Sequence, residues 1–397
     1  MSLSAACRAT KQRISPCFQV SKLRFSVSSI SCADRLTFAK PFSDVPKIPA
    51  LPVVGSSWIY FPILGRYNIR KLNEAAWDMY QRYGPVVGEQ LPGRRILVHL
   101  FSADDIRTLY QEEGRTPYRM GALPFKLYHT ERKEYFANAG ILNARMSHII
   151  KEAAEATKSR GNSNENCTIL QHLYNQQKTE FKEIFTFLHD FVIGGTDTTS
   201  GAATFTLYRL AENPAAQEKA RQEVLAATKK SAGTLSADSH QHLGYVKACI
   251  KEALRFHPII PGVNRKINHD VILSGYCIPA NTVLRTEPFV AGRLEENFTR
   301  ASEFLPERWL RSSDDHSSKT NDDTWNLHPF ASLPFSIGPR MCIGRRIAEM
   351  ELCILVAKVL KRYRVENHHG DIGFLTQFTG KPAKPAKFRF VELNTTT

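Results

Sequence analysis

Apolar residues between positions 184 and 211 recur at the three- and four-residue spacing of an α-helix. Phe185, Leu188, Val192 and Thr196 mark one side of this helix, and apolar residues occupy several of its other sides as well. The pattern is longer than an average helix. It therefore predicts a long central helix that is buried around most of its circumference.

Helical spacing also appears elsewhere, and short alternating stretches appear between the helical ones. Further helices are expected at 69–83, 214–230, 246–257 and 343–360. Pro214 suits the first turn of its helix, and Pro258 stops the helix before it. Alternation within 95–100 and 261–286 indicates short strands. Together these patterns predict a mostly α-helical protein with small β-sheets, an α+β fold.

The amino-terminal segment has the composition of a targeting sequence. Residues 1–33 contain no Asp or Glu, yet they hold eight serines and five basic residues. Such a leader is typical of a mitochondrial transit peptide, and a disordered basic tail is the alternative. We expect a leader at 1–39 and one folded domain at 40–397.

The charge balance restricts the partners without choosing among them. The chain has 53 Lys and Arg against 38 Asp and Glu, a net charge of +15. This excess suits a nucleic acid, an anionic membrane or an acidic protein. No run of 18 apolar residues follows the leader, so any membrane contact is expected to be peripheral. The eight cysteines include no C-x-x-C pair, which disfavours a zinc ribbon.

The strongest chemical signal is the stretch FSIGPRMCIG, from Phe335 to Gly344. A lone cysteine is more often a small core residue than a ligand. Here Gly338 and Gly344 permit tight turns on both sides of Cys342, which precedes a predicted helix. Free N–H groups at a helix start stabilise a thiolate. With Arg340 available for an anionic group, such a thiolate suits the axial position of haem iron.

This F-x-x-G-x-R-x-C-x-G stretch resembles the haem-binding loop of the cytochromes P450, which are haem-thiolate monooxygenases. The resemblance implies the cytochrome P450 fold, consumption of O2, and a haem b whose iron is ligated by Cys342. The cofactor-binding residues that it implies besides Cys342 are Phe335, Gly338, Arg340, Gly344 and Arg265. Of these, the two arginines would bind the haem propionates.

A second motif pairs Glu252 with Arg255 three positions later. With Arg308, these residues match the buried Glu-Arg-Arg cluster of the P450 family, which supports the haem pocket. An ordinary surface ion pair is the alternative interpretation, because this spacing often produces one on a helix.

The third motif is Gly194-Gly-Thr-Asp-Thr-Thr199 in the long helix. Each glycine inside a helix costs roughly 1 kcal/mol. The resemblance to the oxygen-binding segment of the P450 family supplies a reason for that cost. It implies a local opening of the helix beside the haem, with Asp197 and Thr198 relaying protons. A plain kink is the alternative.

Four basic positions match those that receive a ferredoxin in the mitochondrial class of the family: Lys247, Lys251, Arg345 and Arg346. The resemblance thus implies electrons from a mitochondrial ferredoxin and its NADPH-dependent reductase. With the leader, it implies a location on the matrix side of the inner mitochondrial membrane, with peripheral contact. A solvated basic face is the alternative. No basic and aromatic motif supports a nucleic-acid partner.

Three framework segments, 37–42, 273–279 and 290–298, resemble arthropod ecdysteroid hydroxylases, above all those that hydroxylate carbon 22 in ecdysone biosynthesis. Another mitochondrial steroid or secosteroid hydroxylase is the alternative.

After Asn143 the family has a helix with a W-x-x-x-R motif, whereas Ala144 follows directly here. We therefore expect a P450 fold truncated near 143/144 by loss of several central helices. A truncated haem-binding protein with little activity also stays open.

Overall fold

The computed structural model describes residues 38–117, 181–230, 241–310, 327–376 and 379–393, together with Leu235 and scattered positions from 144 to 173. The leader up to residue 37 lies outside these ranges, and so does Asn143. The transit peptide and the truncation near 143/144 therefore stay predictions.

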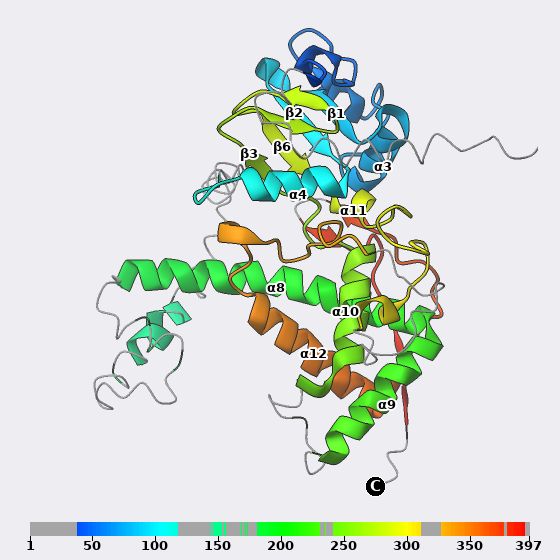
Figure 1. The fold of residues 1–397 in the computed structure, drawn as a ribbon. Helices are drawn as coiled ribbons and strands as arrows, with labels where there is room; N and C mark the ends of the chain where they lie inside the picture. The colour runs from blue at the N-terminus through cyan, green and yellow to red at the C-terminus, as the bar shows by residue number, and fades with distance from the viewer. Residues whose placement is uncertain are drawn as a thin grey trace, which may run out of the picture.

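A four-stranded sheet forms the upper part of the molecule in Figure 1. Its order is β1-β2-β6-β3, with bounds Val86–Gln90, Ile96–Leu100, Val283–Thr286 and Asn264–Lys266. The central pair β2 and β6 is parallel, whereas β1 and β3 pair antiparallel with their neighbours. β2, β3 and β6 lie within the stretches where alternation predicted strands, whereas β1 lies outside them.

Short helices cover the sheet. α3 (Leu72–Tyr83) packs against β1, and α11 (Pro288–Ala291) packs against α3. α4 (Ala103–Glu112) follows β2 directly and packs against it. Helix α3 begins three residues later than the predicted 69, because the backbone of Lys71 is not helical.

Four longer helices form the main helical body. They are α8 (Phe181–Glu212), α9 (Pro214–Lys230), α10 (Gly244–Phe256) and α12 (Arg345–Arg362). Figure 1 shows α8 running across the middle of the molecule, with α12 below it and α10 crossing its right end. Each of the four contacts the other three, and they enclose one apolar core. The mostly helical prediction is confirmed, as is the start of α9 at Pro214.

The prediction that the long helix is buried around most of its circumference is right for its second half and wrong for the stretch around the glycine pair. Phe205 and Leu210 are fully buried, whereas Val192 is 42% exposed and Gly194 and Asp197 are also exposed. The physical reason is the position of the other helices, since the α8 residues in the shared core all lie beyond position 200. Within the described ranges, the first half of α8 contributes no residue to that core.

Smaller elements complete the described structure. Three two-stranded pairs are β4 with β5 (Val271–Leu273, Tyr276–Ile278), β7 with β10 (Tyr363–Glu366, Arg389–Glu392) and β8 with β9 (Leu375–Thr376, Gly380–Lys381). Short 3-10 helices include η6 (Pro306–Trp309) and η7 (Gly338–Arg340). No helix among the described residues is both long enough and apolar enough to cross a membrane.

Candidate functional site

Cys342 lies in the loop between η7 and α12, and two backbone hydrogen bonds fix the shape of this loop. The Cys342 N–H donates to the Phe335 carbonyl at 2.9 Å, and the Arg345 N–H donates to the Cys342 carbonyl at 3.3 Å. Gly338 has a φ of +74°, which a residue with a side chain rarely adopts. The loop therefore has a defined shape, and it leaves Cys342 exposed.

Exposure distinguishes Cys342 from the other cysteines that the structure describes. Cys249 and Cys353 are buried, and Cys277 is intermediate. Burial raises the pKa of the Cys249 thiol well above its usual range and raises that of Cys353 to about 11. These two cysteines are therefore protonated core residues, whereas the Cys342 thiol can reach a ligand.

The loop lies against α8 close to its glycine pair. A Cβ built on Gly344 would lie 3.6 Å from the Phe191 ring and 3.9 Å from the Cys342 sulfur. One turn further along α8, a Cβ on Gly194 or Gly195 would meet no atom within 4 Å. The thiol and the glycine pair therefore lie near one stretch of α8 that has open space beside it.

The glycine pair does not interrupt α8. The helix is continuous from Phe181 to Glu212, so the predicted local opening is absent from this structure. The Thr198 hydroxyl donates to the Gly194 carbonyl at 2.7 Å, which ties it to the preceding turn of its own helix. Asp197 is the adjacent residue and is exposed, and the Thr198 hydroxyl is not directed to it. The space at the glycines arises from their missing side chains and not from a break.

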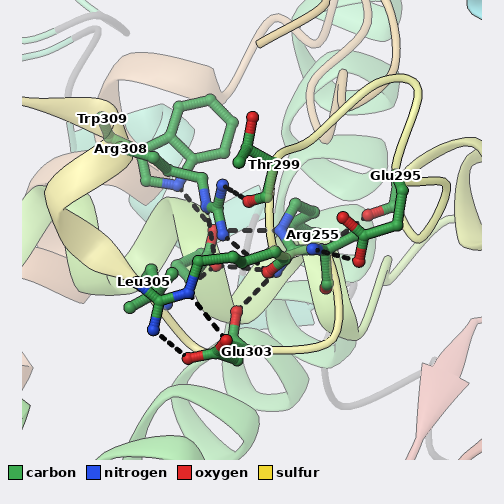
Figure 2. Close-up of polar contacts among 11 residues, drawn as sticks. Arg255, Glu295, Thr299, Glu303, Leu305, Arg308 and Trp309 are labelled. Atoms are coloured by element: carbon green, nitrogen blue, oxygen red, sulfur yellow. Dashed lines mark hydrogen bonds and ion pairs between the residues drawn. The ribbon is translucent and has the colours of Figure 1, made fainter. Parts of the chain in front are cut away.

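Glu252, Arg255 and Arg308 meet in a buried cluster. Figure 2 shows Arg255 and Arg308 with the neighbouring Leu305 and Trp309. Arg255 donates to Glu252 through Nε at 3.0 Å and through Nη2 at 2.7 Å. Arg308 Nε lies 3.1 Å from the same carboxylate. The Leu305 N–H and the Trp309 indole also donate to it, at 3.0 and 2.8 Å. The alternative of a surface ion pair is wrong, because all three charged side chains are fully buried.

The two arginines of this cluster also bind backbone carbonyls. Arg255 Nη1 donates to Gly292 and Ala301 at 2.6 and 2.8 Å, and Arg308 Nη1 donates to Thr299 at 2.8 Å. Burial lowers the pKa of Arg308, and the attraction of Glu252 opposes that effect. The cluster therefore connects α10 to the irregular segment between α11 and η6.

The two arginines expected at the haem propionates both act on a third residue, Glu113. Arg265 Nε donates to Glu113 Oε2 at 2.6 Å, and both side chains are buried. Arg340 Nε donates to the Pro117 carbonyl at 3.4 Å, and its charge helps to lower the pKa of Glu113 against the larger raising effect of burial. Sequence reasoning did not find Glu113, because it follows another glutamate and belongs to no motif.

The four basic positions lie on two helices that contact each other. Lys247 on α10 is half-buried, whereas Lys251 is exposed and its Nζ lies 5.8 Å from the centre of the Trp309 ring. Arg345 at the start of α12 donates to Glu349 at 2.9 Å, while Arg346 is exposed. The structure thus leaves Lys251 and Arg346 more accessible than their two neighbours.

Comparison with known families shows to which protein family this chain belongs. The family model described as Cytochrome P450 matches residues 122–390. The chain belongs to the cytochrome P450 family. Several curated relatives that it matches are named as mitochondrial proteins. The probable mitochondrial cytochrome P450 12a5 of Drosophila melanogaster is 38% identical over 206 residues, covering 51% of this chain and 38% of the relative.

Two further relatives align over more of this P450. The mitochondrial cytochrome P450 302a1 of Drosophila melanogaster is 25% identical over 484 positions, covering 90% of this chain and 96% of the relative. The mitochondrial cholesterol side-chain cleavage enzyme of Macaca fascicularis is 33% identical over 294 residues, covering 73% and 54%. The chain spans about two fifths of the length of the first relatives that it matches, from 38% to 46%.

The P450 family implies a haem held by a cysteine thiolate, and the residues of this chain fit such a group. Cys342 offers an exposed sulfur from a closed loop, and Gly194 and Gly195 leave space beside it. Next to Arg265, the buried carboxylate oxygen Glu113 Oε1 has no hydrogen-bond partner among the described residues. An accessible cysteine sulfur, open space at the glycine pair and two arginines that could bind carboxylates are therefore present in the described structure.

Proposed function

We propose that this chain is a haem-thiolate monooxygenase of the mitochondrial type, in which Cys342 ligates the iron. One observation carries the proposal: the exposed Cys342 sulfur lies in a closed loop against α8, near the open space at Gly194 and Gly195. When bound, the haem supplies the chemistry that splits O2, placing one oxygen atom in a C–H bond and releasing the other as water, with two electrons and two protons consumed.

The other residues of the site have supporting roles in this proposal. Arg340 and Arg265 bind the haem carboxylates, since a guanidinium binds a carboxylate with good geometry. Phe335, Gly338 and Gly344 shape the loop around the sulfur. Phe335 is half-buried against the helical core, and Gly338 has the positive φ that the turn requires.

Asp197 and Thr198 hold and move protons on the α8 side. Asp197 is exposed and can exchange protons with water. The Thr198 hydroxyl donates to the Gly194 carbonyl, so its oxygen keeps a lone pair with which to accept a proton. The adjacent positions of the Asp197 carboxyl and the Thr198 hydroxyl support a proton relay toward the open space at the glycine pair.

Electrons come from a mitochondrial ferredoxin that is reduced by its NADPH-dependent reductase. The mitochondrial names of the relatives support this part of the proposal. The accessible charges of Lys251 and Arg346 support it as well, with Lys247 and Arg345 beside them on the same two helices. An acidic protein partner would be drawn to this surface.

The proposed substrate is a steroid, specifically an ecdysteroid precursor that is hydroxylated at carbon 22. Similarity to a cholesterol side-chain cleavage enzyme supports the steroid class. The framework segments at 37–42, 273–279 and 290–298 support the narrower choice. Another mitochondrial steroid or secosteroid hydroxylase is the alternative, because framework segments do not form the substrate pocket.

We place the protein on the matrix side of the inner mitochondrial membrane, in peripheral contact with the bilayer. Near the amino-terminal end of the described chain, Val53 and Ile63 are 90% and 94% exposed, and Leu64 is also exposed. Arg66 and Arg70 follow within a few residues. Exposed apolar side chains beside basic residues suit an anionic lipid surface.

The decisive experiment is an absorption spectrum of the reduced, CO-treated protein. The wild type should give the red-shifted band of a thiolate-ligated haem, and Cys342→Ala should lose it. Cys277→Ala is the matched control, because Cys277 is the other described cysteine that is not buried. Retention of the band in the Cys342 variant would show the assignment wrong.

A second candidate function is a truncated haem-binding protein with little turnover. The apolar side chains of Val192 on α8 and Ile343 beside Cys342 favour it, since both are exposed near the site. A sterol pocket with walls open to water would bind its substrate weakly. Product formation with ferredoxin, reductase and NADPH separates the two candidates. Normal turnover of this chain would eliminate the second one.

A further inference from the structure

The carboxyl-terminal end of α4 is fastened to the loop before Cys342. The Ser336 hydroxyl donates to the Tyr110 hydroxyl at 3.0 Å. Arg265 on β3 lies over the same tyrosine, with its guanidinium carbon 5.8 Å from the ring centre. Glu113 follows directly after α4 and lies against both Arg265 and Gly338 of the Cys342 loop. This helix end therefore connects two parts of the haem site that are far apart in the sequence.

The two adjacent glutamates at this helix end have opposite environments. The Glu113 side chain is 1% exposed and pairs with Arg265. The Glu112 side chain is 47% exposed and pairs with His269. A carboxylate is almost never fully buried without a purpose for its charge. Within the part of the chain that the structure describes, the buried Glu113 oxygen Oε1 has no hydrogen-bond partner.

The contacts of Arg265 leave part of its guanidinium available. Nε donates to Glu113, and Nη1 donates to the carbonyl of Asn264 at 3.1 Å. No hydrogen bond from Nη2 occurs among the residues that the structure describes. Arginine can bind two carboxylates at once, because its planar group carries five N–H donors. Holding Nε on one side fixes the plane in which Nη2 lies.

Gly338 brings the Cys342 loop against the same carboxylate. A Cβ built on Gly338 would lie 2.9 Å from Glu113 Oε1, closer than real Cβ atoms approach another atom. The glycine therefore lets Glu113 and the loop pack directly together. Glu113 thus contacts one predicted propionate ligand, Arg265, and the turn that contains Arg340.

We propose that Glu113 is a positioning residue of the haem site: it holds Arg265 through Nε so that Nη2 stays available to a haem carboxylate. This inference rests on the proposed haem-thiolate function. Glu113 itself need not touch the haem. Its effect is on how long the cofactor stays bound, since an untethered Arg265 would lose orientation and its counter-charge together.

The test measures haem dissociation from the haem-loaded full chain, by transfer to excess apomyoglobin followed in the visible spectrum. Glu113→Gln keeps the shape and removes the charge, and Glu112→Gln is the matched control. We expect about tenfold faster haem loss in the first variant, the order of one charge-assisted hydrogen bond. We expect less than about a twofold change in the control, as for an exposed ion pair.

A double-variant comparison shows whether Glu113 acts through Arg265. In an Arg265→Met background, Glu113→Gln should add less than about a twofold further change. Equal effects of Glu113→Gln in both backgrounds would overturn the proposal. So would haem loss as slow as in Glu112→Gln, or a drop in the melting temperature of the haem-free chain large enough to account for the faster loss.

The outcomes also separate this proposal from the proposed function. A wild-type chain that takes up no haemin overturns both. A wild-type chain that gives the thiolate spectrum, with Glu113→Gln retaining haem equally well, overturns the positioning role alone.

Discussion

His99 on β2 and Glu287 at the end of β6 are 188 positions apart in the sequence, yet His99 Nδ1 lies 2.7 Å from Glu287 Oε1. The other ring nitrogen lies 2.9 Å from Glu89 Oε2 on β1. Burial alone would lower the pKa of His99, but the hydrogen bonds to Glu287 and Glu89 outweigh it and raise the pKa to about 9. The imidazolium therefore connects three neighbouring strands inside the sheet.

The stability of the sheet should depend on pH through His99. Its folded pKa, about 9, lies above the ordinary value of 6.5. The stabilisation is thus complete below pH 6.5 and is lost as the pH rises through about 9. Over this window we expect the free energy of unfolding to fall by on the order of 3 kcal/mol. Urea unfolding from pH 6 to 9.5 measures it, with His99→Gln as the variant that lacks the dependence.

Arg285 and Tyr60 are the other titratable groups that face this histidine cluster. Arg285 donates to Glu287 at 2.8 Å, and Tyr60 is coupled to both carboxylates. Burial raises the pKa of Tyr60 far above its usual value, so this phenol keeps its proton over the pH window of the test. Parallel pH profiles for the wild type and His99→Gln would therefore contradict the role of His99.

Glu252→Gln should destabilise the chain strongly. The substitution leaves Arg255 and Arg308 buried near each other without their shared carboxylate. Removing one partner of a buried ion pair costs about 3–5 kcal/mol. Urea unfolding at neutral pH measures the loss. Glu303→Gln is the control, since that side chain is half exposed and pairs with Arg300 at the surface; similar losses in both variants would count against the buried cluster.

Thr198→Ala should retain haem but uncouple electron use from hydroxylation. Without the hydroxyl, protons reach the α8 side less selectively, and the two electrons reduce O2 to hydrogen peroxide. We expect the ratio of product to NADPH to fall about tenfold or more. Thr196→Ala is a close control, because its hydroxyl makes the same type of bond two residues earlier, to the Val192 carbonyl at 2.7 Å. Equal peroxide yields in both variants would refute the proton role.

Lys251→Gln and Arg346→Gln should weaken ferredoxin-driven reduction more than Arg345→Gln does. Arg345 is already paired with Glu349, whereas the other two side chains are exposed. Removing an accessible charge lowers the association rate several-fold at low salt and less at high salt. Stopped-flow reduction across salt concentrations measures the difference. Lys358→Gln, an exposed site further along α12, is the control; an equal loss there would point to overall charge.

The positions of prolines and the spacing of apolar residues predicted several helix boundaries correctly. Pro214 begins α9, and α10 ends before Pro258. The i,i+3 spacing of Glu252 and Arg255 was visible, although their burial came from tertiary packing. Spacing along the chain could not reveal Glu113 with Arg265 or His99 with Glu287, because each pair joins distant segments. Nor could periodicity show that α8 is largely exposed from Val192 to Asp197, since a pattern does not say which helices cover it.

The parallel pairing of β2 with β6 has a consequence for how the length of this chain can vary. Leu97 lies opposite Val283 and Leu100 opposite Thr286. The pairing of the two strands therefore closes the chain between residues 100 and 283 into one long loop. The entropy of closing such a loop grows only with the logarithm of its length, and making it half as long again costs about 0.4 kcal/mol. Extra helices between residues 100 and 283 therefore cost the pairing of β2 with β6 little in loop-closure entropy.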